Sequence, residues 1–206
     1  HNQLRTHGVN LHLDNGLAKI NHENNKSTVI LQDGEKITAD LIVMSIGVSP
    51  NTELAEEAGL STGETGAIKV NKYLQTDDED IYAIGDAVEI EHYISGDPVH
   101  IPLAGPANKQ GRITANNICG RKEKYSGAQG TSIAKIFELS AGTTGSNEKQ
   151  LQESGLDYEV SYTTSKNHAG YYPGAVPMTV KIIFTPEEGK LLGAQITGYD
   201  GVDKRI

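Results

Sequence analysis

The residues best placed to do chemistry lie at the end of the segment TDDEDIYAIGDA, residues 76–87. Its apolar run 81–84 stops at Gly85 and Asp86, a pattern that predicts a buried strand of a parallel sheet followed by a turn. In open α/β sheets, ligands bind beyond the carboxyl ends of the strands. Gly85 would let a ligand approach the backbone, and Asp86 could accept a hydrogen bond from a sugar-type hydroxyl. A plain Gly-Asp turn explains the same residues equally well.

A second candidate for ligand binding is the start of a predicted helix. Residues 107–118 have a helical pattern, Pro106 suits the first turn, and Gly120 ends the helix. A helix N-terminus carries free amide groups and about half a positive charge, which suits an anionic or electron-rich ligand. We expect this N-terminus to point toward the same crevice. An ordinary helix with glycine and proline at its start also fits the pattern.

The elements that precede these residues are predicted from local patterns. Alternating apolar residues predict strands at 9–13 and 17–20. Asp33-Gly34 lies between two alternating runs, which is the strongest short-range signal of a hairpin. The continuously apolar run 41–47 predicts a central buried strand.

A helix and a strand connect this run to the Gly-Asp segment. The helix is predicted to open at Pro50 and Asn51 and to end at Gly59, and the strand covers residues 67–70.

The character of the chain changes between residues 120 and 127, where we place a domain boundary. A strand followed by a turn is predicted within 131–145, and further strands are predicted at 158–163 and in a hairpin joined by TPEEG. A short helix is predicted to be capped by Ser146 and ended by Gly155, and Asp200 is a candidate N-cap for a last helix. Strands with one helix on a face predict a separate α+β domain.

The composition favours a globular protein that binds neither nucleic acid nor membranes. Of the 206 residues, 36% are hydrophobic and 22% are charged, and the 23 glycines fit a fold with many tight turns. The net charge is −9 with scattered basic residues, so tracking of a phosphate backbone is not expected. The longest apolar run, 41–48, is far shorter than the roughly 20 residues of a membrane span, and no export signal is visible.

The single cysteine, Cys119, excludes an internal disulfide and is compatible with a cytoplasmic protein. It lies at a predicted helix C-terminus, where the helix dipole disfavours a thiolate, so inert packing is expected. The histidines lack the close spacing of metal ligands, and no metal is expected.

Several motifs together resemble one family. GVSPN at 47–51, TDDEDIYAIGDA at 76–87 and PLAGPANKQGR at 102–112 occur in the order and spacing of the flavin-dependent pyridine nucleotide-disulfide oxidoreductases. The resemblance covers nearly the whole chain. HAGYYPGA at 168–175 and LLGAQITGYDGVDKRI at 191–206 look most similar to the coenzyme A-disulfide reductase branch, which includes relatives that reduce persulfides.

The resemblance implies an α/β nucleotide-binding segment with a mostly parallel sheet, followed by an α+β dimerisation domain. Residues 1–41 would be the end of the NAD(P)H-binding domain, 42–120 the second segment of the FAD-binding domain, and 121–206 a truncated dimerisation domain of a homodimer. The family's GxGxxG loop for FAD, its NAD(P)H loop and its redox-active cysteine would lie upstream. No catalytic residue is therefore expected within the chain.

The resemblance also implies roles for single residues. Asp86 would bind the FAD ribityl chain, with Gly85 permitting the approach, while Leu103, Ala104 and Gly105 would lie at the pyrimidine edge of the flavin. Among the residues implied to bind substrate, Asn108 and Arg112 are similar to residues that face coenzyme A, and Tyr171 is similar to the tyrosine that reaches the active site of the other subunit.

A purely structural role remains an alternative for some of these residues. Arg112 could simply pair with a nearby carboxylate. Tyr171 and Tyr172 could pack in an interface.

The function implied is that of a cytoplasmic reductase with FAD and NAD(P)H as cofactors. Hydride would pass from NAD(P)H to FAD, and electrons would pass on to a cysteine that reduces coenzyme A disulfide or a persulfide. The first alternative is an NADH oxidase or peroxidase built on the same FAD scaffold. The second is a non-catalytic dimerisation or nucleotide-binding fragment, since the isolated chain is expected to be inactive.

Overall fold

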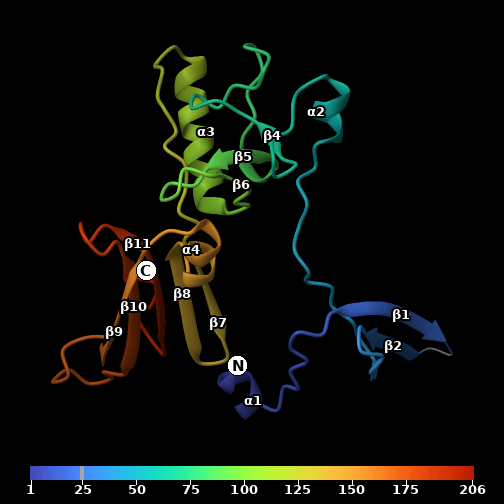
Figure 1. Cartoon of the computed structure of the whole chain (residues 1–206), viewed down its shortest axis with the longest axis vertical. Helices are drawn as coiled ribbons and strands as arrows, with labels where there is room; N and C mark the ends of the chain where they lie inside the picture. The colour runs from blue at the N-terminus through green and yellow to red at the C-terminus, as the bar shows by residue number, and fades with distance from the viewer. Residues whose placement is uncertain (24–25) are drawn as a thin grey trace. The chain divides into compact units, whose positions relative to one another are not determined.

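The computed structural model describes residues 1–23 and 26–206, which divide into two compact units, His1–Val48 and Ser49–Ile206 (Figure 1). In the first unit a short helix precedes a three-stranded antiparallel sheet: α1 (Asn2–Thr6), β1 (Leu17–Glu23), β2 (Lys26–Leu31) and β3 (Lys36–Ala39). The strand predicted at 17–20 is thereby confirmed as the start of β1.

The predicted hairpin at Asp33-Gly34 joins β2 to β3 and is confirmed. The Leu31 amide donates to the Glu35 carbonyl at 2.9 Å, and the Asp33 carboxylate accepts from the Glu35 amide at 2.9 Å. Gly34 has φ +90°, a conformation that glycine adopts without a steric penalty. The turn therefore forms from contacts within a few residues.

Two predicted strands of the first unit are wrong. Residues 9–13 and 41–47 are not in strands, and Leu41 and Ile46 are 80% and 82% exposed. A strand forms only where its amides and carbonyls find partners, and no ladder partner is assigned to either run within residues 1–23 and 26–206. Apolar composition alone was therefore not sufficient to place these residues in a sheet.

The first half of the second unit is a small sheet packed with one long helix. Its elements are α2 (Glu53–Glu57), β4 (Ile68–Lys69), the 3-10 turn η1 (Gly85–Ala87), β5 (Val88–Glu91), β6 (Pro98–Val99) and α3 (Ala104–Ile118). β5 pairs parallel with β4 and antiparallel with β6. Five buried side chains form the core: Leu74, Val88, Ile90, Ile113 and Tyr125.

The outcomes of the predictions in this half are mixed. The strand at 67–70 is confirmed as β4, α2 begins slightly later than predicted, and α3 begins at Ala104 with Pro106 in its first turn. The strand at 81–84 is wrong, because Tyr82 forms only an isolated bridge to Gln75 before the chain enters η1. The buried strand is instead β5, which follows the Gly-Asp pair.

The second half contains a five-stranded antiparallel sheet in the order β7-β8-β11-β10-β9. Its elements are β7 (Ser132–Ile136), β8 (Leu139–Gly145), α4 (Glu148–Ser154), β9 (Glu159–Lys166), β10 (Pro177–Phe184) and β11 (Leu191–Gly198). Leu151 of α4 packs with Ile183 and Leu192 of the sheet, as the α+β prediction requires. The predicted β10–β11 hairpin is confirmed.

Two predicted caps in this half need correction. The N-cap of α4 is Asn147, not Ser146, because Asn147 and Gln150 exchange side-chain and backbone hydrogen bonds. Asp200 caps no helix, because its carboxylate accepts a hydrogen bond from Asn167 at 2.8 Å and residues 201–205 form turns and bends. None of the helices in the described part of the chain has the length and apolarity needed to cross a bilayer.

Candidate functional site

The Gly-Asp pair forms a tight turn between an extended segment and β5. Ile84 is extended, with φ −147° and ψ 167°, and Gly85 has φ +82°, a conformation that favours glycine. The Gly85 amide donates to the Oε1 atom of Gln110 at 2.6 Å. His100 Nε2 lies 2.6 Å from the Asp86 carbonyl oxygen, which can only accept, so the ring nitrogen is the donor.

The start of α3 lies beside this turn. Leu103 is the N-cap residue in an extended conformation, and no described side chain caps the helix. An ideal Cβ atom at Gly105 would meet no atom within 4 Å, and the same holds at Gly85. The space beside both glycines is therefore not filled by other residues.

The structure brings four of the predicted residues together around one open hollow of about 750 Å³. Its lining combines the Gly-Asp turn with one face of α3 and comprises Asp86, Ala104, Ala107, Asn108, Gly111 and Arg112. Leu103 and Gly105 flank Ala104 in the chain. Predicted cofactor and substrate residues thus meet in a single site.

Asn108 and Arg112 already have partners in this site. The Asn108 side chain donates to the Ala104 carbonyl at 2.9 Å. The Arg112 guanidinium contacts the carboxylate of Glu123, with Nη2 3.0 Å from Oε1. The simple pairing of Arg112 with a carboxylate, one of the two interpretations from the sequence, is therefore present in the structure.

Tyr171 does not line the hollow. Its side chain is 83% exposed and lies against Tyr172, with ring centroids 4.8 Å apart. The loop that carries both tyrosines is closed by Asn167, a buried side chain that accepts from the Val176 amide at 2.9 Å and donates to Asp200. Tyr171 is thus presented to solvent on an anchored loop.

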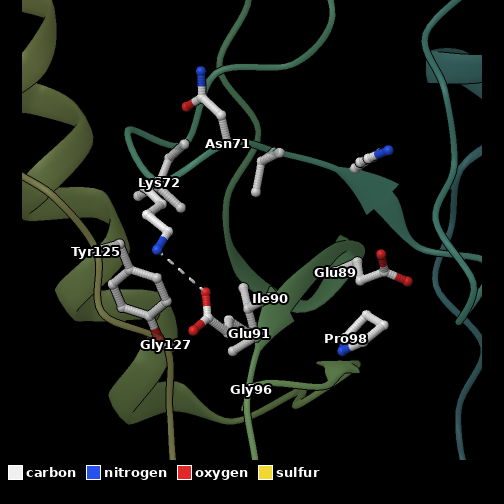
Figure 2. Close-up of a pocket in the computed structure, with 12 residues that line it drawn as sticks. Asn71, Lys72, Glu89, Ile90, Glu91, Gly96, Pro98, Tyr125 and Gly127 are labelled. Carbon is white, nitrogen blue, oxygen red and sulfur yellow. Dashed lines mark ion pairs between the residues drawn. The ribbon is translucent and has the colours of Figure 1, made fainter. Parts of the chain in front are cut away.

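A separate cavity of about 210 Å³ lies between β5, the segment around Asn71 and the residues near Tyr125 (Figure 2). Lys72 and Glu91 face one another across it, with Nζ 3.7 Å from Oε2. The neighbouring Glu89 is buried, and its carboxylate accepts from the amide and hydroxyl of Thr65. None of the predicted site residues lines this cavity.

Cys119 lies at the C-cap of α3, as predicted, and is exposed, so the expectation that it packs internally is wrong. Within the described residues, no group of three or more histidine, cysteine and acidic side chains could hold a metal ion.

Three residues that contact predicted site residues were not themselves predicted: Gln110, His100 and Glu123. Gln110 is 1% exposed and shares the buried face of α3 with Ile113 and Thr114. A polar side chain on a buried helix face is a signal that it has a hydrogen-bond partner. His100 and Glu123 lie in irregular segments and carry no comparable signal.

The sequence matches two models that belong to one family. The model of the pyridine nucleotide-disulphide oxidoreductases matches residues 1–111, more than half of the chain. The model of the dimerisation domain of the same family matches residues 131–206.

Similar proteins of curated function include three named reductases or oxidases. The chain is 38% identical over 198 residues to the CoA-dependent NAD(P)H sulfur oxidoreductase of Pyrococcus furiosus. The aligned region spans 96% of this chain and 44% of that protein. It is 34% identical to an NADH oxidase of Methanocaldococcus jannaschii, over 98% of the chain and 45% of the relative. It is 32% identical to a coenzyme A disulfide reductase of Staphylococcus aureus, over 88% of this chain and 41% of that protein. The chain therefore spans less than half the length of these relatives.

Two solved structures are closely similar. The chain superposes with a TM-score of 0.94 on reduced Bacillus anthracis CoADR-RHD, at 44% identity and over 100% of this chain and 37% of that one. It also superposes with a TM-score of 0.94 on the NAD-dependent persulfide reductase of A. fulgidus. The identity is 40%, and the match covers 99% of this chain and 38% of that one. The predicted fold class, a nucleotide-binding segment followed by a dimerisation domain, is confirmed. The match of a family model to more than half of the sequence shows that this chain belongs to the pyridine nucleotide-disulphide oxidoreductases.

Proposed function

We propose that the chain is part of a longer NAD(P)H-dependent flavoprotein that reduces coenzyme A disulfide or a related persulfide. NAD(P)H would give a hydride to FAD, and the electron pair would pass to a redox-active cysteine outside these 206 residues. The cysteine thiolate would attack the substrate disulfide and release one thiol, and the electron pair would reduce the resulting mixed disulfide and release the second. Overall, NAD(P)H, one proton and the disulfide would give NAD(P)⁺ and two thiols. The observation that supports this most is the single hollow lined by Asp86, Ala104, Asn108 and Arg112.

The residues around the hollow fit the ribityl and pyrimidine parts of FAD. FAD supplies the redox chemistry when bound, accepting a hydride and passing on electrons. Asp86 would accept a hydrogen bond from a ribityl hydroxyl, and the absence of a side chain at Gly85 leaves room for that approach. The open N-terminus of α3, at Leu103, Ala104 and Gly105, would stabilise negative charge near it.

The substrate would lie at the far side of the same hollow, against Asn108 and Arg112. An arginine fork suits the phosphate groups of a coenzyme A derivative because its donors match paired oxygens. Glu123 holds the guanidinium in place before substrate arrives. Tyr171 would contact the active site of the second subunit in a homodimer, since it is exposed on a loop of the dimerisation domain.

The domain boundaries and the cellular location remain part of the proposal. We infer that residues 1–41 end the NAD(P)H-binding domain, 42–120 form part of the FAD-binding domain and 121–206 belong to the dimerisation domain. We also infer that the whole protein works in the cytoplasm. These 206 residues contain a single cysteine, Cys119, and so have no internal disulfide, which is compatible with a reducing compartment.

One alternative function is supported by a specific finding. The NADH oxidase of Methanocaldococcus jannaschii is 34% identical, so an oxidase or peroxidase is the second candidate. In such an enzyme the cysteine would cycle through sulfenic acid. A third candidate, a non-catalytic nucleotide-binding or dimerisation fragment, applies to the 206 residues alone.

Steady-state kinetics of the full-length protein separates the first two candidates. With NADH or NADPH as donor, we expect turnover with coenzyme A disulfide or coenzyme A persulfide. Turnover only with oxygen or peroxide would favour the oxidase. Titration of the isolated chain with FAD tests the third candidate, for which we expect no tight stoichiometric binding.

A further inference from the structure

The backbone of the Gly-Asp turn is held by two side chains that come from one stretch of the sequence, residues 100–110. Gln110 lies on the second turn of α3, and its Oε1 atom accepts the Gly85 amide at 2.6 Å. His100 lies just before α3, and its Nε2 atom donates to the Asp86 carbonyl at 2.6 Å. The amide of Gly85 and the carbonyl of Asp86 are thus both fixed.

The burial of Gln110 indicates why an amide is needed there. The side chain is 1% exposed and lies beside the core residues Ile113 and Tyr125. Burying an amide among apolar side chains is unfavourable unless its polar atoms find partners. An apolar residue would fill this position at lower cost, and the polar contacts that offset the cost of a glutamine are those with the Gly85 amide and the Tyr125 side chain.

The turn itself needs external support. Gly85 has φ +82°, and glycine has more accessible backbone conformations than any other residue. Without Gln110 and His100, Gly85 could leave this conformation and carry the Asp86 carboxylate away from the hollow. A ligand that binds Asp86 would then have to order the turn itself and would bind more weakly.

We propose that Gln110 and His100 are positioning residues that preset Asp86 for the flavin ribityl chain and couple it to the start of α3. The inference rests on the proposed FAD site and adds residues that do not touch FAD. Its consequence is that the two motifs that bind the flavin form one ordered unit before the cofactor arrives.

The test uses the full-length protein, freed of FAD, and four variants. Gln110→Met keeps the length of the side chain and removes the acceptor, whereas Gln110→Glu keeps an acceptor oxygen. His100→Ala removes the second contact. Gln195→Met makes the same substitution at a half-buried glutamine of β11, far from the turn in sequence, and is the matched control.

Three measurements are made on each variant: the Kd for FAD from quenching of flavin fluorescence, hydrogen exchange of residues 84–87 without FAD, and the melting temperature. Gln110→Met removes the acceptor of the Gly85 amide, so this amide should exchange faster. We expect this variant to bind FAD about ten-fold more weakly or worse. Gln110→Glu should keep the Gly85 amide protected, because an acceptor oxygen remains, and should lower the melting temperature, because it buries a carboxyl group. His100→Ala should weaken binding about three- to ten-fold with an unchanged melting temperature.

The outcomes separate this inference from the proposed function. If wild type fails to bind FAD, the proposed function fails, and exchange at Gly85 still decides the positioning role. If wild type binds FAD and both Gln110→Met and His100→Ala bind it equally well, with unchanged exchange at residues 84–87, the positioning role is overturned. If Gln110→Met does not fold, His100→Ala alone carries the test.

Discussion

Arg112 of α3 and Glu123 form a two-contact ion pair, with Nη2 3.0 Å from Oε1 and Nη1 3.3 Å from Oε2. Asn116, one turn further along the helix, donates to the same carboxylate at 2.6 Å. The hydrogen bond from Asn116 and the neighbouring Arg112 hold the pKa of Glu123 below its usual value. The guanidinium is therefore held at the edge of the hollow opposite a carboxylate that stays ionised.

Substitution of Arg112 tests whether this guanidinium also serves the substrate. We expect Arg112→Ala to raise KM for coenzyme A disulfide about ten-fold with kcat little changed, since a hydrogen bond to a charged group contributes about 1.5–3 kcal/mol. Steady-state kinetics provides the measurement, and Arg121→Ala, an exposed arginine beyond the end of α3, is the control. Unchanged KM would show that Arg112 only pairs with Glu123.

Substitution of Asp86 tests the cofactor end of the hollow. Asp86→Ala should weaken FAD binding about ten-fold or more, because it removes a charged acceptor from a ribityl hydroxyl. The Kd is measured by fluorescence titration of the apoprotein. Asp80→Asn, an exposed carboxylate in the same segment, should bind FAD like wild type. Equal affinities for Asp86→Ala and wild type would contradict the assignment.

Glu89 should contribute more to stability than its neighbour Glu91, although both line the cavity in Figure 2. Glu89 is buried and accepts from the Thr65 amide and hydroxyl at 2.8 and 2.9 Å. Glu89→Ala should lower the free energy of unfolding by about 2 kcal/mol because these donors lose their acceptor.

Glu91→Ala provides the matched control on the same strand. Its ion pair with Lys72 is exposed and long, so the loss should be about 0.5 kcal/mol. Denaturant titration measures both values. Equal losses would show that burial of Glu89 has no energetic consequence.

The stability of the dimerisation domain should depend on pH through Glu148 of α4 and Lys181 of β10, which form an ion pair. The hydrogen bond from Lys181 lowers the pKa of Glu148, and the same bond raises the pKa of Lys181. The contribution of Glu148 is therefore complete above its unfolded pKa and is lost as the pH falls through the lowered folded value. The contribution of Lys181 is lost when the pH rises through its raised pKa.

Melting temperatures of wild type and Glu148→Gln between pH 7 and pH 3 measure this effect. The difference between them should shrink as the pH falls below the ordinary glutamate value of 4.5. Glu153→Gln, from an exposed pair with Lys149 in the same helix, should show no such change. A difference that stays constant down to pH 3 would contradict the proposed linkage.

Elements that depend on neighbouring residues were predictable from the sequence. The Asp33-Gly34 hairpin and the end of α4 at Gly155 depend on glycine at positive φ, +90° and +68°. The pairing of β10 with β11 follows from a short turn between two apolar runs. The Gly-Asp turn and the start of α3 were located in the same way, and they form most of the hollow.

Features that depend on distant residues were not predictable. The run 41–47 has the composition of a buried strand, yet its state depends on partner strands that a local pattern cannot identify. Gln110 lies within a recognised motif, but its partner Gly85 is 25 residues away. This contact depends on the packing of α3 beside the turn, which a local sequence pattern does not specify.

Anaerobic reoxidation of the reduced flavin tests the proposed function most directly. The full-length protein is reduced with one equivalent of NADH or NADPH in the absence of oxygen, and coenzyme A disulfide or coenzyme A persulfide is then added. We predict rapid recovery of the oxidised flavin spectrum together with release of coenzyme A thiol. A flavin that stays reduced with both acceptors and is reoxidised only by oxygen or peroxide would contradict the assignment.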